Sequence, residues 1–133
     1  MKPMAPADSA CPCGSAVAYA ACCGRFHHGP QQGQAPTAEA LMRSRYSAFA
    51  LGLHDYLLAT WHTSTRPAAL EPDPPGLKWL GLDVRQHAAQ DADHATVEFV
   101  ARSKLGGRAQ RLHETSRFVR EGGRWFYVDA QTR

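Results

Sequence analysis

The four cysteines of this 133-residue chain lie close together near its amino terminus, and they constrain the fold more than any other feature. They are Cys11, Cys13, Cys22 and Cys23. Thiols this close in sequence cannot cross-link a whole domain, but zinc takes four such ligands in a tetrahedron, each sulfur about 2.3 Å away. Pro12 fixes one backbone angle of the first turn, and Gly14 allows the open angles needed to wrap an ion. The spacing predicts a structural metal site, with zinc as the expected ion and iron as an alternative.

Other uses of these thiols fit the sequence less well. Disulfides need an oxidising compartment, whereas the segment Met1–Pro6 contains no apolar core of a signal peptide. Redox or catalytic thiols would not explain a cluster of four. Two adjacent cysteines can bind one ion only if the backbone turns between them, so His27 or His28 could replace Cys23 as the fourth ligand.

The residues around the cysteines predict a small module with flexible flanks. Ser15 is expected to cap a helical turn over Ala16–Ala21, and Gly24 is expected to end that turn. We divide the chain into a flexible amino terminus (1–10), a metal-binding knuckle (11–26), a linker (27–35) and a main domain (36–133). The linker is polar and contains glycine and proline, so it would let the knuckle move unless Phe26 packs the knuckle onto the main domain.

The main domain has the pattern of helices followed by strands. Thr37 is expected to cap a helix over Ala38–Leu51, and a second helix over Leu53–Thr60 follows Gly52. Four β-rich runs come next, separated by glycine and aspartate turn signals. They cover Leu77–Ala88, Ala95–Ser103, Arg108–Arg120 and Arg124–Asp129. Helices before an antiparallel meander predict an α+β fold, with helices on one face of a curved sheet whose mouth could form a pocket.

Two parts of the chain resemble known families. The knuckle CPCGSAVAYAACCG resembles the SEC-C motif, a zinc knuckle also found in the preprotein-translocase motor ATPase, where the last pair is usually Cys-His instead of Cys22-Cys23. The runs PTAEALMRSRYSAFALGLHDYLLATWHTSTRP and RLHETSRFVREGGRWFYVD are similar to the YchJ-like family of bacterial proteins. This resemblance spans nearly the whole chain from Cys11. It implies a SEC-C knuckle followed by a nuclear-transport-factor-2-like, cystatin-like cone, and it implies a metal but no particular reaction.

Arg45 is the most informative position outside the cysteines. It falls in the middle of the apolar stripe of the first expected helix, where a guanidinium must find a partner or reach the surface. Alternation along the third β-rich run puts Glu114 on the core face, between Leu112 and Phe118. We therefore expect Arg45 and Glu114 to form a buried ion pair, with Asp83 as the competing partner for Arg45.

This interior pair could be structural, or it could belong to a ligand pocket. In the second case Glu114 would act with His62, His113 or Tyr46, as an acid or base beside an oxyanion donor. None of these residues has a spacing that demands catalysis, so we interpret the protein as non-enzymatic. The three tryptophans are expected in the core rather than in a ligand-binding lining.

Composition limits the remaining functions. Apolar residues make up 44% and charged residues 20%, ordinary values for a globular protein, which we place in the cytoplasm. No apolar run approaches the roughly 18 residues that span a bilayer. The net charge of +3 gives weak support to nucleic acid or a ribosome as a partner, and the sequence does not indicate an oligomeric state.

Our first functional hypothesis is an adaptor whose zinc knuckle contacts a protein. The resemblance to the motor ATPase implies a secretion chaperone or a ribosome as that partner. The second hypothesis is a small-molecule-binding protein or acid/base enzyme that acts through the cone. A third, weaker hypothesis is a metal or redox sensor that uses exposed thiolates.

Overall fold

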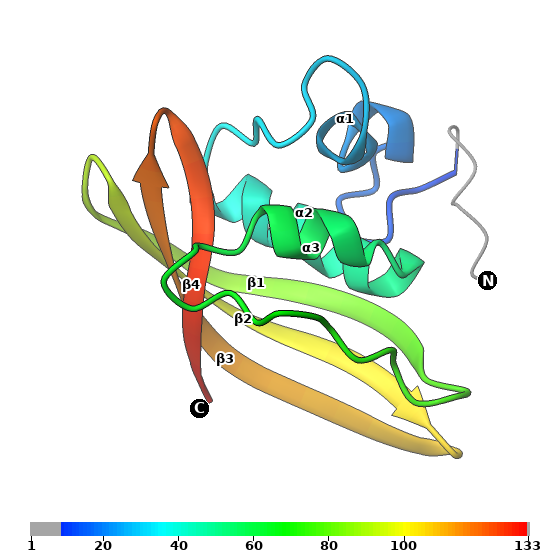
Figure 1. Cartoon of the computed structure of the whole chain (residues 1–133). Coiled ribbons are helices and arrows are strands. Elements are labelled where there is room, and N and C mark those ends of the chain that lie inside the picture. The colour runs from blue at the N-terminus through cyan, green and yellow to red at the C-terminus, as the bar shows by residue number, and fades with distance from the viewer. Residues whose placement is uncertain (1–8, 133) are drawn as a thin grey trace.

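A computed structural model describes residues 9–132 and shows three layers: a curved sheet, two helices packed on it, and the knuckle on top of them (Figure 1). The helical elements are the 3-10 turn η1 (Tyr19–Ala21), α1 (Gly24–His27), α2 (Ala38–Leu51) and α3 (His54–Ala59). The strands are β1 (Lys78–Asp91), β2 (His94–Leu105), β3 (Arg108–Glu121) and β4 (Arg124–Thr132). They form one antiparallel sheet in the order β1-β2-β3-β4. The predicted α+β class is confirmed.

Helix α2 begins and ends as the sequence predicts. The Ala40 N–H donates to the hydroxyl of Thr37 at 3.0 Å, which caps the first turn. Gly52 adopts a left-handed conformation with φ of 73°, and this lets the chain reverse into α3. Two serines of α2, Ser44 and Ser47, are fully buried. Helix α2 is therefore covered on both sides, by the sheet below and by the knuckle above.

The sheet presents a concave apolar face to α2. On β2 the alternating residues Val97, Phe99 and Ala101 are buried, as the sequence predicts. On β3 the residues Glu114 and Phe118 share this face. The backbone after α3 lies beside β4, where the His62 N–H donates to the carbonyl of Tyr127 at 2.7 Å. The segment after α3 is thereby fixed to the sheet.

A bulge near the start of β1 corrects one prediction. Trp79 pairs with Ser103, but Gly81 pairs with the next residue along β2, so Leu80 has no partner and is exposed. The extra residue shifts the alternation of β1, so that Trp79 and Leu82 both face the interior. Asp83 then points away from the interior, and its carboxylate accepts a hydrogen bond from Arg85 Nε at 2.7 Å. Asp83 is therefore not a partner for Arg45.

The knuckle packs against the main domain. Phe26 and His27 are both buried, so the alternative in which Phe26 fixes the knuckle is confirmed, and His27 does not belong to a linker. At the other end of the knuckle, Ala10 forms an antiparallel bridge with Ala18, and the Tyr19 N–H donates to the Ser9 carbonyl at 2.7 Å. The remainder of the segment expected to be flexible, 1–8, lies outside the described residues. None of the helices within residues 9–132 is both long and apolar enough to cross a membrane.

Candidate metal centre and cone cavity

The two cysteine pairs are brought together by short turns. The first pair lies on a turn closed by the Gly14 N–H, which donates to the carbonyl of Cys11 at 3.2 Å. The second pair follows η1, where the Cys22 N–H donates to Tyr19 O at 3.0 Å. Two expectations were wrong here: Ser15 caps no helix, because the helical turn is only Tyr19–Ala21, and Gly24 begins α1 instead of ending a turn.

The four sulfur atoms have the spacing that a tetrahedral zinc ion needs. All four lie within 4.8 Å of one another, and the Cys13 and Cys22 sulfurs are 3.7 Å apart. Zinc–sulfur bonds of about 2.3 Å at tetrahedral angles place sulfurs about 3.8 Å apart. The four cysteines could therefore hold such an ion, with Cys23 as the fourth ligand.

Histidine does not replace Cys23 in this arrangement. The Nε2 atom of His27 lies 2.8 Å from the carbonyl oxygen of Ser44, to which it can only donate. Its Nδ1 atom accepts from the Tyr19 hydroxyl at 2.6 Å, so both ring nitrogens are engaged away from the sulfurs. The neighbouring His28 is exposed.

The close approach of the thiols shifts the pKa values of two of them in opposite directions. Hydrogen bonds from Cys13 and then Cys23 lower the pKa of the Cys11 thiol to about 3, whereas the pKa of Cys23 is raised, mainly by its hydrogen bond to Cys11. The sulfurs thus compete for protons, and a divalent cation can hold all four as thiolates. Hydroxyls lie beside two of them: Ser47 Oγ is 3.5 Å from Cys11 Sγ, and Ser15 Oγ is 3.1 Å from Cys22 Sγ.

Polar contacts fasten the knuckle to α2. The Arg43 guanidinium donates to the Cys13 carbonyl at 3.2 Å, while its Nε donates to Glu39 at 3.0 Å. His27 reaches Ser44 as described, and its ring packs edge-on against Tyr56 at 4.8 Å between centroids. The Ser44 hydroxyl lies 2.7 Å from the Tyr56 hydroxyl. The metal site is therefore part of the packing of the main domain.

Replacing His27 with leucine is expected to lower the free energy of unfolding by about 2 kcal/mol, because two buried hydrogen bonds are lost. Burial lowers the pKa of His27, so the neutral ring is the form that makes these bonds. Urea denaturation at pH 7.5 with zinc present measures the change. His28→Gln, on the exposed adjacent residue, is the control and should leave stability within about 0.5 kcal/mol. Equal stability of the two variants would contradict the role given to His27.

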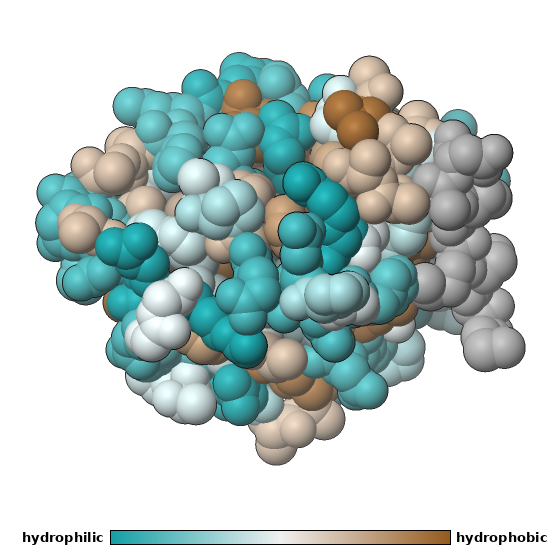
Figure 2. Space-filling view, turned by 90° about the horizontal axis from the view of Figure 1, so that it is seen from above, coloured by the Kyte–Doolittle hydropathy of each residue, from teal (hydrophilic) through white to brown (hydrophobic). Residues whose placement is uncertain are grey.

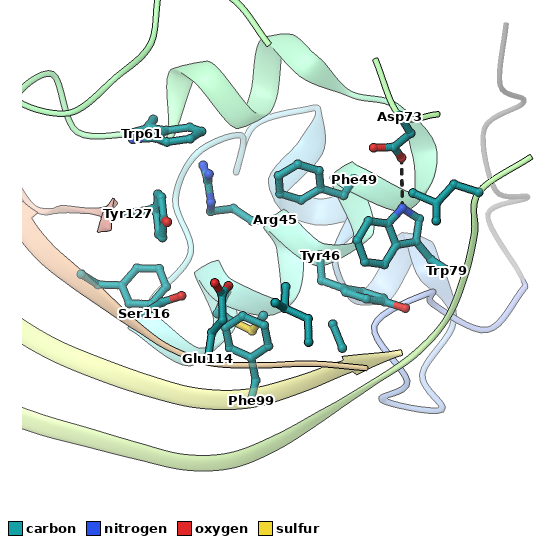
Figure 3. A pocket seen from close by; sticks show the side chains of 15 residues that line it. Arg45, Tyr46, Phe49, Trp61, Asp73, Trp79, Phe99, Glu114, Ser116 and Tyr127 are labelled. Atoms are coloured by element: carbon teal, nitrogen blue, oxygen red, sulfur yellow. Dashed lines mark hydrogen bonds between the residues drawn. The ribbon is translucent and has the colours of Figure 1, made fainter. Parts of the chain in front are cut away.

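The cone encloses a cavity of about 410 Å³ between α2, the loop after α3 and the sheet (Figure 3). Most of its walls are apolar or aromatic. The lining residues are Met42, Arg45, Tyr46, Phe49, Trp61, Asp73, Leu77, Trp79, Phe99, Ala101, Leu112, Glu114, Ser116, Phe118 and Tyr127. Two of the three tryptophans expected in the core therefore line this space, and their rings face it.

Arg45 lies inside this cavity and is only 5% exposed. Its Nη1 donates to the carbonyl of Leu57 and to the hydroxyl of Thr60, both at 2.7 Å. The guanidinium carbon lies 4.5 Å from the centroid of Tyr127 and 5.1 Å from that of Trp61. Burial lowers the pKa of Arg45 to about 10, which leaves it charged at neutral pH.

The predicted ion pair between Arg45 and Glu114 does not form. Both residues line the cavity, but none of the ion pairs among residues 9–132 involves Arg45. Carbonyl and hydroxyl groups at the end of α3 take the place of the carboxylate. The reason is that α3 ends directly beside Arg45, so its last carbonyls supply acceptors that need no second charge.

The other expected site residues divide between the cavity and the surface. Tyr46 lines the cavity and packs edge-on against Trp79, with ring centroids 5.6 Å apart. His62 does not line it: its ring nitrogens bond Ser64 Oγ at 2.6 Å and Glu121 Oε2 at 2.9 Å. His113 faces the other side of the sheet, where it bonds Glu98 at 2.7 Å. An acid/base set around Glu114 therefore lacks both histidines.

Comparison with known proteins assigns the chain to a family. The family described as "YchJ, middle NTF2-like domain" matches residues 37–130, and the SEC-C motif matches residues 9–25. The chain belongs to the YchJ-like family. Among its relatives, a UPF0225 protein of Methylibium petroleiphilum is 67% identical over 121 residues, covering 91% of this chain and 87% of the relative. A UPF0225 protein of Bordetella parapertussis is 58% identical over 133 residues and covers the full length of both chains.

Two solved structures resemble the YchJ-like chain over nearly its whole length. The solution structure of a SEC-C motif containing protein from Rhodopseudomonas palustris is 34% identical with a TM-score of 0.81, covering 94% of this chain and 99% of the other. The crystal structure of such a protein from Psychrobacter arcticus is 29% identical with a TM-score of 0.78, covering 96% and 84%. The resemblance predicted from the sequence and the fold that it implied are both confirmed.

Some polar and aromatic residues at or beside the cavity were not anticipated as site residues. Thr60 and Tyr127 contact the Arg45 guanidinium, and Asp73 accepts a hydrogen bond from Trp79 Nε1 at 3.1 Å. The sequence indicated only that Arg45 would be buried. A buried guanidinium needs hydrogen-bond acceptors, but the sequence did not indicate which residues would supply them. Residues near the end of a helix are good candidates for such partners, because carbonyls there lack intrahelical donors.

Proposed function

We propose that this protein is a non-enzymatic binding protein: the cone holds a small, largely apolar molecule, and a zinc ion in the knuckle stabilises the fold. The cavity in the cone is the observation that carries the proposal. Its volume of about 410 Å³ lies within the range of roughly 300–1,000 Å³ typical of ligand sites, which also combine apolar walls with a few polar groups.

The position of the four cysteines supports a structural role for a metal bound there. Cys11, Cys13 and Cys23 are buried against α2, so the four sulfurs form a closed site without an open coordination position. Zinc bound there supplies folding energy, because a module of this size has almost no core of its own. The four cysteines would hold the ion, and Ser15 and Ser47 would donate hydrogen bonds to the thiolates.

Filling the cavity is the experiment that tests ligand binding. In the variant Ala101→Phe a ring would occupy the space beside Phe99, because Ala101 lines the cavity and is buried. A library of small aromatic compounds is screened by ligand-observed NMR against the wild type and this variant. Compounds that bind the wild type should lose at least about tenfold in affinity for Ala101→Phe. The matched control is Ala109→Phe, at an exposed alanine of β3, which should bind like the wild type. Equal binding by all three proteins would contradict the proposal.

Protein docking through the knuckle is a second proposal, supported by one observation. Val17 of the knuckle is 45% exposed and is the large apolar side chain that the knuckle presents to solvent within residues 9–132. Seen from above the knuckle, however, the surface mixes hydrophilic and hydrophobic residues, and the strongly hydrophobic ones form only small separate spots (Figure 2). A secretion chaperone or a ribosome would therefore have to bind through a small apolar area. Pull-down from cytosol with wild type and Val17→Asp tests this: a partner lost only in the variant would support docking.

A further inference from the structure

We propose that the cone cavity binds a small organic acid with one carboxylate and an apolar body, and that the Arg45 guanidinium holds the carboxylate. This inference rests on the proposed function, since it names the class of ligand for the same cavity. It follows from the surroundings of Arg45, from the rings that fix it in place, and from the charges of the remaining lining residues.

The Arg45 guanidinium still has unused donors that face the cavity. A guanidinium carries five N–H groups, and the two on Nη1 are taken up by Leu57 and Thr60. Within residues 9–132, Nε and Nη2 of Arg45 donate to no acceptor. The Nε–H and one N–H of Nη2 form a planar edge that matches the two oxygens of a carboxylate.

The charge of Arg45 is also left without a counter-ion. Its two hydrogen-bond acceptors, the Leu57 carbonyl and the Thr60 hydroxyl, are both neutral. A buried cation in such surroundings is costly, because its hydration is lost without a compensating charge. An incoming carboxylate would supply that charge where the local dielectric constant is low and the attraction is strong.

Aromatic rings hold the guanidinium in place and would contact the ligand next to its carboxylate. Tyr127 and Trp61 both lie within 5.1 Å of the guanidinium carbon, close enough for cation–π attraction. Figure 3 shows Trp61 and Tyr127 around the end of the Arg45 side chain, with Phe49 beside it. The guanidinium is therefore oriented before a ligand arrives, and the adjoining walls suit an apolar or aromatic body.

Two carboxylates in the same lining limit the ligand to a single negative charge. Asp73 is hydrogen-bonded to Trp79, and Glu114 points from the sheet toward the cavity (Figure 3). Both are more exposed than Arg45, so solvent screens them more strongly and they do not cancel its attraction for an anion beside it. They would repel a second negative group on the body of the ligand. The cavity is thus suited to monoacids more than to diacids.

Three probes with the same ring and different charge test the inference. They are 1-naphthylacetate (an anion), 1-naphthylacetamide (neutral) and 1-naphthylmethylamine (a cation). Their dissociation constants are measured by calorimetry at pH 7.5 on the full chain with its metal. A charge-assisted hydrogen bond predicts that the acid binds about 10- to 100-fold more tightly than the amide. In Arg45→Met the acid should lose this advantage, whereas Arg85→Gln, a change of an exposed arginine on the outside of the sheet, should keep it.

The possible results separate the inference from the proposed function. If the acid and the amide bind equally, or the amine binds most tightly, the choice of an acid is wrong but a ligand-binding cavity remains. If none of the probes binds the wild type, both the inference and the proposed function are contradicted for ligands of this size. The wild-type comparison decides between these results even if Arg45→Met does not fold.

Discussion

Replacing Cys13 with serine is expected to release the bound metal and to lower the free energy of unfolding by several kcal/mol. Cys13 is fully buried, and its sulfur lies 3.7 Å from that of Cys22. Structural zinc contributes on the order of 10 kcal/mol of apparent binding energy in small zinc modules. The loss should be smaller here, because the main domain supplies a core of its own. Because α2 lies between the knuckle and the sheet, loss of the metal should also lower the unfolding temperature of the main domain.

Elemental analysis and thermal unfolding measure these two effects together. The wild type should carry about one zinc ion per chain and the Cys13→Ser variant almost none. Ser15→Ala serves as the control, since it removes a hydroxyl beside Cys22 without removing a ligand, and it should keep the metal. A variant that loses zinc and still unfolds at the wild-type temperature would show that the knuckle does not support the main domain.

Replacing Arg45 with methionine is expected to raise the stability of the protein while it removes binding of organic acids. A buried cation without a counter-ion lowers the stability of the fold, because its hydration is lost without a compensating charge. Apolar side chains that replace whole buried ion pairs often leave stability unchanged or raise it by about 1–4 kcal/mol. The acceptors left behind keep a hydroxyl beside them, because Thr60 Oγ1 donates to the carbonyl of Tyr56 at 2.8 Å and lies 3.3 Å from the carbonyl of Leu57. A gain in stability at the expense of binding is typical of functional residues.

Chemical denaturation of wild type and variant measures this change. We expect the midpoint of Arg45→Met to move to higher denaturant concentration with an unchanged slope. Arg85→Gln, at the exposed partner of Asp83, should show no shift beyond about 0.5 kcal/mol. If Arg45→Met is instead less stable by several kcal/mol, the guanidinium is a structural group that fixes α2 to α3, and the cavity needs no ligand.

The parts of the structure that depend on local signals were predicted well. Thr37 marked the start of α2, and the double glycines at Gly106 and Gly122 marked the two hairpins that set the order β2-β3-β4. The cysteine spacing predicted a cluster of four sulfurs that could hold a metal ion, and the four sulfurs do lie close together. Each of these features depends on residues only a few positions apart, so a short stretch of sequence is enough to predict it.

The failures involve contacts between distant elements. The face of Asp83 was predicted wrongly, because the bulge at Leu80 reverses the alternation of β1; the adjacent Gly81 is the kind of residue that marks such a bulge but does not fix where the extra residue falls. Ser44 and Ser47 look like surface residues of an amphipathic helix, yet they lie under the knuckle. We expected a carboxylate as the partner of Arg45, but one of its acceptors is the backbone carbonyl of Leu57. Every residue has a backbone carbonyl, so the sequence does not indicate which one will accept this hydrogen bond.

An NMR titration of the zinc-loaded, isotope-labelled protein with 1-naphthylacetate locates the site at which the protein binds an organic acid. We expect that site in the cone and not on the outer side of the knuckle. We predict that the largest amide shifts fall on cavity residues of α2 and β3, around Arg45 and Ser116. Shifts that centre on Val17 and the turn beside it, or no saturable shifts at all, would contradict the account.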